Sequence, residues 1–208
     1  MEVLHYVLGA LAGYFIGNIQ FAVIFSRLLH RDDVRRHGSG NAGSTNMLRV
    51  YGVKAGAMTF AGDFLKGVAG ALLGRAIGGQ YMACAMSAGV VLGHNFPVFF
   101  GFRGGKGVAS SFGIILMVTP LWGGITAALA LTVAAVTRTI SLASLTGAVT
   151  YIVLALALGQ DVWIKLFAAF LAGLLVLRHK DNIKRLIKKE EGPLWRAASA
   201  DEKKKRGE

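Results

Sequence analysis

Four short polar clusters hold the residues of this sequence that could do chemistry. The first runs from His37 to Asn46, HGSGNAGSTN, and Arg49 follows it. Glycines let a backbone approach a ligand closely, and the hydroxyls, amides and backbone N–H groups around them can donate to an oxyanion. An arginine adds bidentate contact with phosphate. The cluster therefore predicts an anion site built from Gly38, Ser39, Gly40, Asn41, Gly43, Thr45, Asn46 and Arg49.

Two other interpretations of this first cluster are weaker. Its G-x-G-x-x-G spacing is that of dinucleotide-binding loops, but a charged run rather than a strand precedes it, which argues against that fold. An ordinary loop in which Ser44 or Thr45 caps the next helix is the remaining alternative. Such a loop does not need three glycines, two asparagines and three hydroxyls in ten residues.

The second cluster, GHNFPVFFGFRGGKG, extends from Gly93 to Gly107. It differs from a nucleotide-binding P-loop, because three residues rather than four separate Gly101 from the Gly-Lys pair and a glycine follows the lysine. Two cations beside free amides, at the start of a helix, still favour a phosphate. The predicted phosphate loop is Arg103, Gly104, Gly105, Lys106 and Gly107. His94 and Asn95 either join this site or are structural partners at a helix end.

The third and fourth clusters are shorter. In TRTISLAS, residues 137–144, Ser141 could cap the following helix or contact a ligand. In RHKDNIKR, residues 178–185, His179 and Asn182 are three apart and share a helical face. A histidine there can carry protons or bind phosphate. For Lys184, Arg185, Lys188 and Lys189 we prefer contact with anionic lipid.

The elements that must position these clusters are membrane helices. Of the 208 residues, 54% are hydrophobic and only 16% charged, with the charges gathered in a few stretches, which is typical of membrane proteins. The net charge is +12, but the basic residues flank apolar runs and the sequence lacks the aromatic motifs of RNA binders. We therefore expect no nucleic-acid partner. Cys84 is the single cysteine, and no ligand spacing indicates a metal or another cofactor.

The charge pattern predicts an all-α protein with about seven transmembrane helices. The apolar segments are 3–27, 53–76, 80–100, 108–119, 121–137, 142–160 and 162–178. A break at Pro120 splits a charge-free stretch that is too long for one span. With that break, nearly all basic loops fall on one side, which places the N-terminus outside and the C-terminus in the cytoplasm.

Residues 1–187 are expected to form a single transmembrane domain, and residues 188–208 a charged, disordered cytoplasmic tail. Asp63 and Lys66 lie inside an apolar segment and are three residues apart. Because ionisable groups at membrane depth are costly, a mutual ion pair is the simplest expectation for them.

The motifs GSGNAGSTNMLR, GHNFPVFFGFRGGKGVA, SLAS and RHKDNIKRL occur in this order. Together they resemble the bacterial integral-membrane acyl-phosphate:glycerol-3-phosphate acyltransferases, over residues 5–187. Because the charge pattern places these motifs on the cytoplasmic side of the bacterial inner membrane, we expect the active site to face the cytoplasm, and we expect a monomer. The resemblance implies transfer of a fatty acyl group from acyl phosphate to the 1-hydroxyl of glycerol 3-phosphate, which gives lysophosphatidic acid and phosphate at the start of phospholipid synthesis.

The resemblance also assigns roles to residues. Catalytic positions would be Ser39, Arg49, Lys106, His179 and Asn182. The first loop would bind acyl phosphate, and glycerol 3-phosphate would contact Arg49, Arg103, Gly104, Gly105, Lys106, Gly107, Ser141 and His179. The base would be either His179 or the donor's own phosphate. No histidine has an acidic residue five positions later, and G-x-S-x-G is missing, which argues against thioester-dependent and serine acyl-enzyme chemistry.

Two other classes of protein compete with an enzyme. A transporter for a phosphorylated metabolite would suit many helices with glycine breaks. Transporters, however, bind near the membrane midplane, often between repeated halves, whereas the polar motifs here are predicted on one face and no repeat is evident. A structural scaffold would not need two cationic glycine-rich loops.

Overall fold

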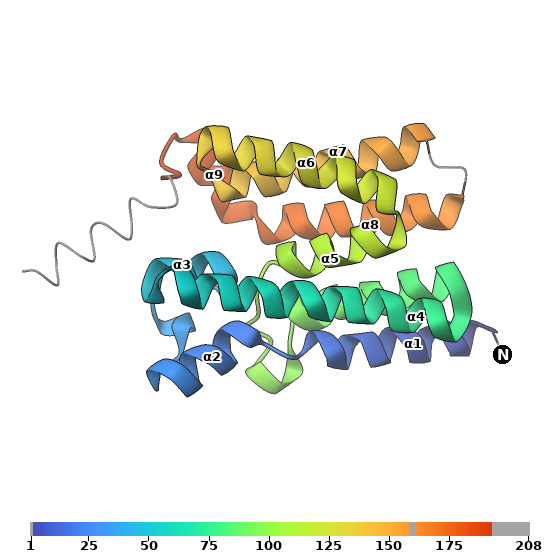
Figure 1. The fold of residues 1–208 in the computed structure, drawn as a ribbon, viewed down its shortest axis with the longest axis horizontal. Coiled ribbons are helices and arrows are strands. Elements are labelled where there is room, and N and C mark those ends of the chain that lie inside the picture. The colour runs from blue at the N-terminus through green and yellow to red at the C-terminus, as the bar shows by residue number, and fades with distance from the viewer. Residues whose placement is uncertain (1, 159–160, 193–208) are drawn as a thin grey trace, which may run out of the picture.

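The residues that the computed structural model describes, 2–158 and 161–192, form helices joined by loops, and they include no strand (Figure 1). This confirms the all-α prediction. The elements in chain order are α1 (Glu2–Gly17), α2 (Phe21–His30), the 3₁₀ turn η1 (Val34–Arg36), α3 (Ser44–Tyr51), α4 (Val53–Asn95), η2 (Val98–Phe100), α5 (Val108–Val118), α6 (Pro120–Thr137), α7 (Ile140–Leu158), α8 (Val162–Arg178) and α9 (Lys180–Ile187). Figure 1 shows α3 and α9 at the end of the bundle away from the N-terminus.

Helix α4 is two antiparallel arms. Gly78 leaves helical geometry and Gly79 has φ +70°, a left-handed conformation that glycine adopts without strain. The arms then pack closely, since a Cβ atom at Gly74 would lie 2.7 Å from the Cα atom of Ala83. The predicted break between segments 53–76 and 80–100 is therefore present, and it returns the chain to the end of the bundle where α4 began.

Helix α1 packs against the second arm of α4 through glycines. A Cβ atom at Gly13 would lie 2.0 Å from the carbonyl oxygen of Met86, and one at Gly89 would lie 1.9 Å from that of Ala10. Small residues four apart allow such backbone contact between membrane helices. This contact fixes the second arm, and with it His94, from which the second glycine-rich loop departs.

Four helical stretches of the described chain are long and apolar enough to cross a membrane: Val3–His30, Val53–Phe100, Pro120–Thr137 and Ile140–Leu158. A fifth is counted if α8 and α9, bent by 63°, form one span. The chain thus has the helices of an integral membrane protein. The predicted break at Pro120 is confirmed, because α5 ends at Val118 and α6 begins at Pro120.

The predicted ion pair between Asp63 and Lys66 is confirmed. Lys66 Nζ lies 2.7 Å from Asp63 Oδ1, and both side chains are buried. The ammonium also donates to the carbonyl of Ile19 at 2.6 Å, in the break between α1 and α2, and contacts His94 Nδ1 at 2.8 Å. An ammonium only donates, so His94 accepts through Nδ1 as a structural partner at this helix end. His94 also lines the inner cavity of the site described below.

The predicted tail lies mostly outside the described residues, which stop at Gly192. Its first part, 188–192, is described and turns back towards the bundle.

Candidate active site

One cavity brings members of all four predicted clusters together. This inner cavity has a volume of about 470 Å³ and is lined by Ser39, Arg49, Lys106, Ser141, His179 and Asn182, among others. The predicted residues Asn41, Gly43, Thr45, Asn46 and Gly107 also line it. Segments more than 100 residues apart in the chain therefore meet at one site.

An outer cavity of about 920 Å³ adjoins the inner one and shares lining residues with it, among them Ser39, Asn41, Arg49, Lys106 and Asn182. The predicted residues that line only the outer cavity are Gly38, Gly40, Arg103 and Gly104. Gly105 lines neither cavity. The site thus has room for more than one phosphate-bearing ligand.

The first glycine-rich loop, residues 37–46, is shaped by Asn46. Its Oδ1 accepts the Ser39 N–H at 2.9 Å, and its Nδ2 donates to the carbonyls of Val34 in η1 and of His37, each at 3.1 Å. Gly38 has φ +57°, and a Cβ atom there would lie 2.3 Å from Asn46 Oδ1. The polar atoms of Asn46 are thus engaged within the loop and with η1, which differs from the predicted direct contact with a ligand. The Ser39 side chain remains exposed at the cavity.

Arg49 reaches the site from α3. This helix begins at Ser44, so the positive end of its dipole lies at the inner cavity. Arg49 is partly buried and lines both cavities. Its guanidinium makes no hydrogen bond or ion pair with any residue that the structure describes, which leaves its donors available for a phosphate.

Two arginines hold the second glycine-rich loop, residues 96–107, by its carbonyl groups. Arg178 donates to the Gly105 carbonyl through Nε at 3.2 Å and through its second terminal nitrogen at 2.9 Å. Arg35 donates to the Phe100 carbonyl at 2.7 Å and is itself paired with Asp33. The two guanidiniums fix the loop in front of Lys106 and add positive potential beside it.

Gly105 must be glycine because the buried His94 ring occupies the space of a side chain. A Cβ atom at Gly105 would lie 2.1 Å from His94 Nε2 and 2.7 Å from the Ala42 carbonyl oxygen. The Gly105 N–H donates to the His94 carbonyl at 3.1 Å. Gly107, with φ +79°, then turns the chain into α5.

Lys106 donates to Asn182 Oδ1, which joins the second loop to α9. Burial lowers the pKa of Lys106 to about 8, the carboxylate of Glu191 opposes this shift, and nearby arginines add to it. A lysine in this range is still largely protonated near neutral pH. It can therefore balance negative charge that develops on a bound ligand.

His179 is buried, and its Nδ1 lies 2.8 Å from the Leu175 carbonyl oxygen. A carbonyl only accepts, so Nδ1 carries the proton, and in a neutral ring Nε2 is an acceptor. Burial, aided by the charge of Lys106, lowers the pKa of His179 to about 4. The ring is thus neutral at pH 7 and suited to accept a hydrogen bond from a hydroxyl.

These two shifts predict the pH dependence of activity. We expect kcat/KM to fall as the pH rises through about 8, because Lys106 then loses its proton in the free enzyme. His179 should add no acid limb until the pH nears its pKa of about 4. In a Lys106→Arg variant, whatever its overall rate, the fall in kcat/KM should move to higher pH, since arginine stays charged. A wild-type profile that is flat through pH 9 would contradict this assignment.

The sequence patterns gave no site role to Arg35, Arg178 or Glu191. Arg35 lies outside the four polar clusters, Arg178 begins the fourth cluster without a predicted role, and Glu191 fell in the predicted tail. The contacts of Arg35 and Arg178 with the second loop, and of Glu191 with Ser141, join residues at least 50 positions apart. Spacing along the chain carries no signal for such contacts.

Membrane-length helices, with two glycine-rich loops, Arg49 and Lys106 at one cavity, define an integral membrane protein whose site suits phosphate-bearing ligands. The sequence model of the family described as Glycerol-3-phosphate acyltransferase matches residues 7–189. The chain therefore belongs to the glycerol-3-phosphate acyltransferase family.

Relatives and solved structures agree with this membership. A glycerol-3-phosphate acyltransferase of Thermoanaerobacter sp. (strain X514) is 45% identical over 90% of this chain and 95% of its own. One from Finegoldia magna is 39% identical over 93% and 98%. The crystal structure of PlsY, an integral membrane glycerol 3-phosphate acyltransferase, in its glycerol 3-phosphate form has a TM-score of 0.84 at 34% identity, over 93% of this chain and 96% of that one.

Proposed function

We propose that the protein transfers a fatty acyl group from acyl phosphate to the 1-hydroxyl of glycerol 3-phosphate. The products are 1-acyl-glycerol 3-phosphate, which is lysophosphatidic acid, and inorganic phosphate. The observation that carries the proposal is the inner cavity, where Arg49, Lys106, His179 and Asn182 meet. The relatives of the chain are named glycerol-3-phosphate acyltransferase. A PlsY structure in a lysophosphatidic acid form also resembles this chain, with a TM-score of 0.81. The family membership favours this reaction over transport of a phosphorylated metabolite.

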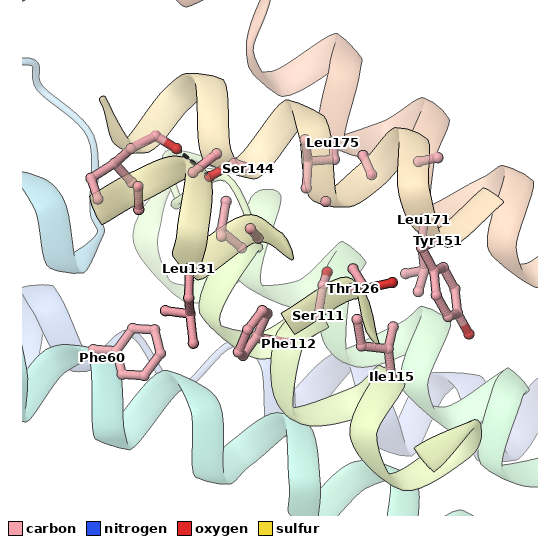
Figure 2. Close-up of a pocket in the computed structure, with 18 residues that line it drawn as sticks. Phe60, Ser111, Phe112, Ile115, Thr126, Leu131, Ser144, Tyr151, Leu171 and Leu175 are labelled. Carbon is pink, nitrogen blue, oxygen red and sulfur yellow. Dashed lines mark hydrogen bonds between the residues drawn. The ribbon is translucent and has the colours of Figure 1, made fainter. Parts of the chain in front are cut away.

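An apolar pocket beside the inner cavity suits the acyl chain. It has a volume of about 160 Å³ and is lined from α4, α5, α6, α7 and α8, by side chains that include Phe112, Ile115 and Leu171 (Figure 2). Phe60, Val108, Ile140 and Ser144 line both this pocket and the inner cavity. Polar and apolar parts of one donor molecule can therefore be held at the same time.

Gly147 offers a test of this acyl pocket. A Cβ atom there would meet Ala130 and Thr126 at 3.4 and 3.6 Å, which is ordinary contact, so Gly147→Ala should be tolerated. Gly147→Met should fill part of the pocket and raise KM for palmitoyl phosphate about tenfold, with less effect on a short-chain donor, because lost chain contacts scale with buried methylenes. An equal rise in KM for both donors would show that the acyl chain binds outside this pocket.

We assign residue roles as follows. Arg49 and Lys106 hold the phosphates, the Ser39 loop and Asn182 orient the donor, and glycerol 3-phosphate lies against the second loop, with Ser141 and His179 near its other end. The neighbouring 2-hydroxyl donates a hydrogen bond to His179 Nε2, which orients the 1-hydroxyl, and the 1-hydroxyl attacks the acyl carbonyl carbon. The bond from that carbon to the phosphate oxygen breaks.

The proton of the attacking hydroxyl goes to the departing phosphate in this scheme. A buried imidazole with a pKa of about 4 is a weak base at neutral pH. We therefore choose the donor phosphate over His179 as the base, and give His179 the task of orienting the hydroxyl. Phosphate leaves readily, so positioning and charge stabilisation supply most of the acceleration.

The same proposal covers topology. Seven crossings in the bacterial inner membrane, with α3 and α9 at the cytoplasmic end, would place both cavities where soluble glycerol 3-phosphate arrives. The positive-inside pattern and the two-armed α4 support this arrangement. We further expect residues 1–187 to act as one domain in a monomer, in contact with membrane lipid.

Purified protein with palmitoyl phosphate and labelled glycerol 3-phosphate tests the function. We expect labelled lysophosphatidic acid from acyl phosphate, and none from acyl-CoA or acyl-carrier-protein thioesters. Product from a thioester alone would overturn the donor assignment. A folded sample without product from any donor would overturn the enzyme itself.

A further inference from the structure

Glu191 lies beyond the end of α9, yet the chain brings it back to the site. Lys189 adopts a left-handed conformation with φ +57°. The Glu190 N–H donates to the Arg185 carbonyl at 2.8 Å, and the Lys189 N–H donates to that of Leu186 at 3.1 Å. This is the hydrogen-bond pattern that reverses a chain at a helix end. The reversal places Glu191 against the face of α9 that carries Asn182.

The Glu191 carboxylate is held by three side chains. Its Oε1 accepts from Ser141 Oγ at 2.7 Å and from Asn182 Nδ2 at 2.6 Å. Its Oε2 accepts from Arg185 Nε at 2.6 Å. The side chain of Glu191 is only 13% exposed. Donors from α7 and from two positions of α9 thus converge on one anion.

Those donors belong to the proposed substrate site. Ser141 and Asn182 line the inner cavity with Lys106 and Arg49, and Asn182 accepts from Lys106 while it donates to Glu191. A phosphate group presents the same kind of charged acceptor oxygens as a carboxylate. A substrate phosphate that uses these donors must therefore compete with Glu191.

The charge balance of the cavity points the same way. Asp63 is the other acidic residue that lines the inner cavity, and it is already paired with Lys66. Glu191 is therefore the acidic side chain left to offset Lys106 and Arg185. An anionic substrate brings its own charge and removes the need for this counter-ion.

We propose that Glu191 is an internal competitor for the substrate's phosphate group and thereby sets the apparent affinity of the enzyme for that substrate. In the free protein its carboxylate fills an anion position formed by Ser141, Asn182 and Arg185. When substrate binds, residues 190–192 move away and the phosphate takes over these donors. This inference rests on the proposed function, because it assumes that a substrate phosphate enters this cavity.

The test compares Glu191→Ala and Glu191→Gln with Glu190→Ala, which removes the same charge at an exposed neighbouring position. Loss of a charged competitor should lower KM for the displaced substrate roughly tenfold, as expected for hydrogen bonds to a charged group. The kcat should stay within about twofold of wild type. The substrate whose KM falls, glycerol 3-phosphate or acyl phosphate, identifies the phosphate that displaces Glu191. Glu190 lines the outer cavity but its side chain contacts none of the three donors, so Glu190→Ala should lower KM far less than either Glu191 variant.

Binding of inorganic phosphate, measured by calorimetry in detergent, gives a readout that needs no turnover. The Glu191 variants should bind it roughly tenfold more tightly than wild type. If the enzyme forms no product but the Glu191 variants bind phosphate more tightly than wild type, the proposed function is overturned while Glu191 remains a competitor for phosphate. Unchanged KM and phosphate affinity, or a large fall in kcat, would overturn the competitor and make Glu191 a structural or positioning residue.

Discussion

Replacing Lys106 by methionine is expected to lower kcat by about 10²–10³-fold, the usual effect of removing one preorganised donor from developing charge. Lys106 lies in both cavities and is bonded to Asn182. Methionine keeps an unbranched side chain, so packing in the second loop should change little. Initial rates with palmitoyl phosphate and glycerol 3-phosphate at saturation measure the effect.

Two controls separate this role from general loss of charge. Lys54→Met removes a cation at an exposed position that lines neither cavity, and it should leave kcat unchanged. Adding Asn182→Ala to Lys106→Met should cost little beyond the single change, because residues that act as a unit are not additive. A Lys106→Met enzyme with near wild-type kcat would remove Lys106 from the mechanism.

The second large effect is expected from adding a single methyl group at Gly105. A Cβ atom there would collide with His94 Nε2 at 2.1 Å and with the Ala42 carbonyl oxygen at 2.7 Å. His94 cannot yield easily, since it is buried against Lys66. The loop must move instead and take Lys106 with it. We expect kcat/KM of Gly105→Ala to fall about 100-fold, the cost of misplacing a reacting group by about 1 Å.

Gly124→Ala is the matched control for this change. A Cβ atom at Gly124 meets nothing within 4 Å, so the same methyl group should be neutral in α6. Thermal unfolding in detergent should show both variants folded. If Gly105→Ala keeps full activity while folded, the contact between the second loop and His94 does not position Lys106.

The sequence predicts much of this site because membrane helices restrict where polar groups can lie. Basic loops on one side of the membrane predict that the clusters meet at one end of the bundle, and the inner cavity does join them. The ion pair of Asp63 with Lys66 follows from the cost of unpaired charge at depth. The break at Pro120 follows from helix length and proline chemistry.

The rest depends on contacts that no local pattern encodes. Asn46 is the same residue type whether it binds a ligand or braces a loop, and its partners decide this. Arg178 resembles any topogenic cation until the Gly105 carbonyl lies beside it. Glu191 lies in a charged stretch of low hydropathy that predicts disorder. The left-handed turn at Lys189 instead holds residues 188–192 against the bundle.

Phosphate release before and after addition of glycerol 3-phosphate tests the central claim most directly. The enzyme, at a concentration that makes one equivalent detectable, is first mixed with palmitoyl phosphate alone. Direct transfer at the inner cavity predicts no burst of phosphate at this stage, and then phosphate and lysophosphatidic acid in equal amounts once glycerol 3-phosphate is added. A burst equal to the enzyme concentration before the acceptor is present would show an acyl-enzyme and contradict the account.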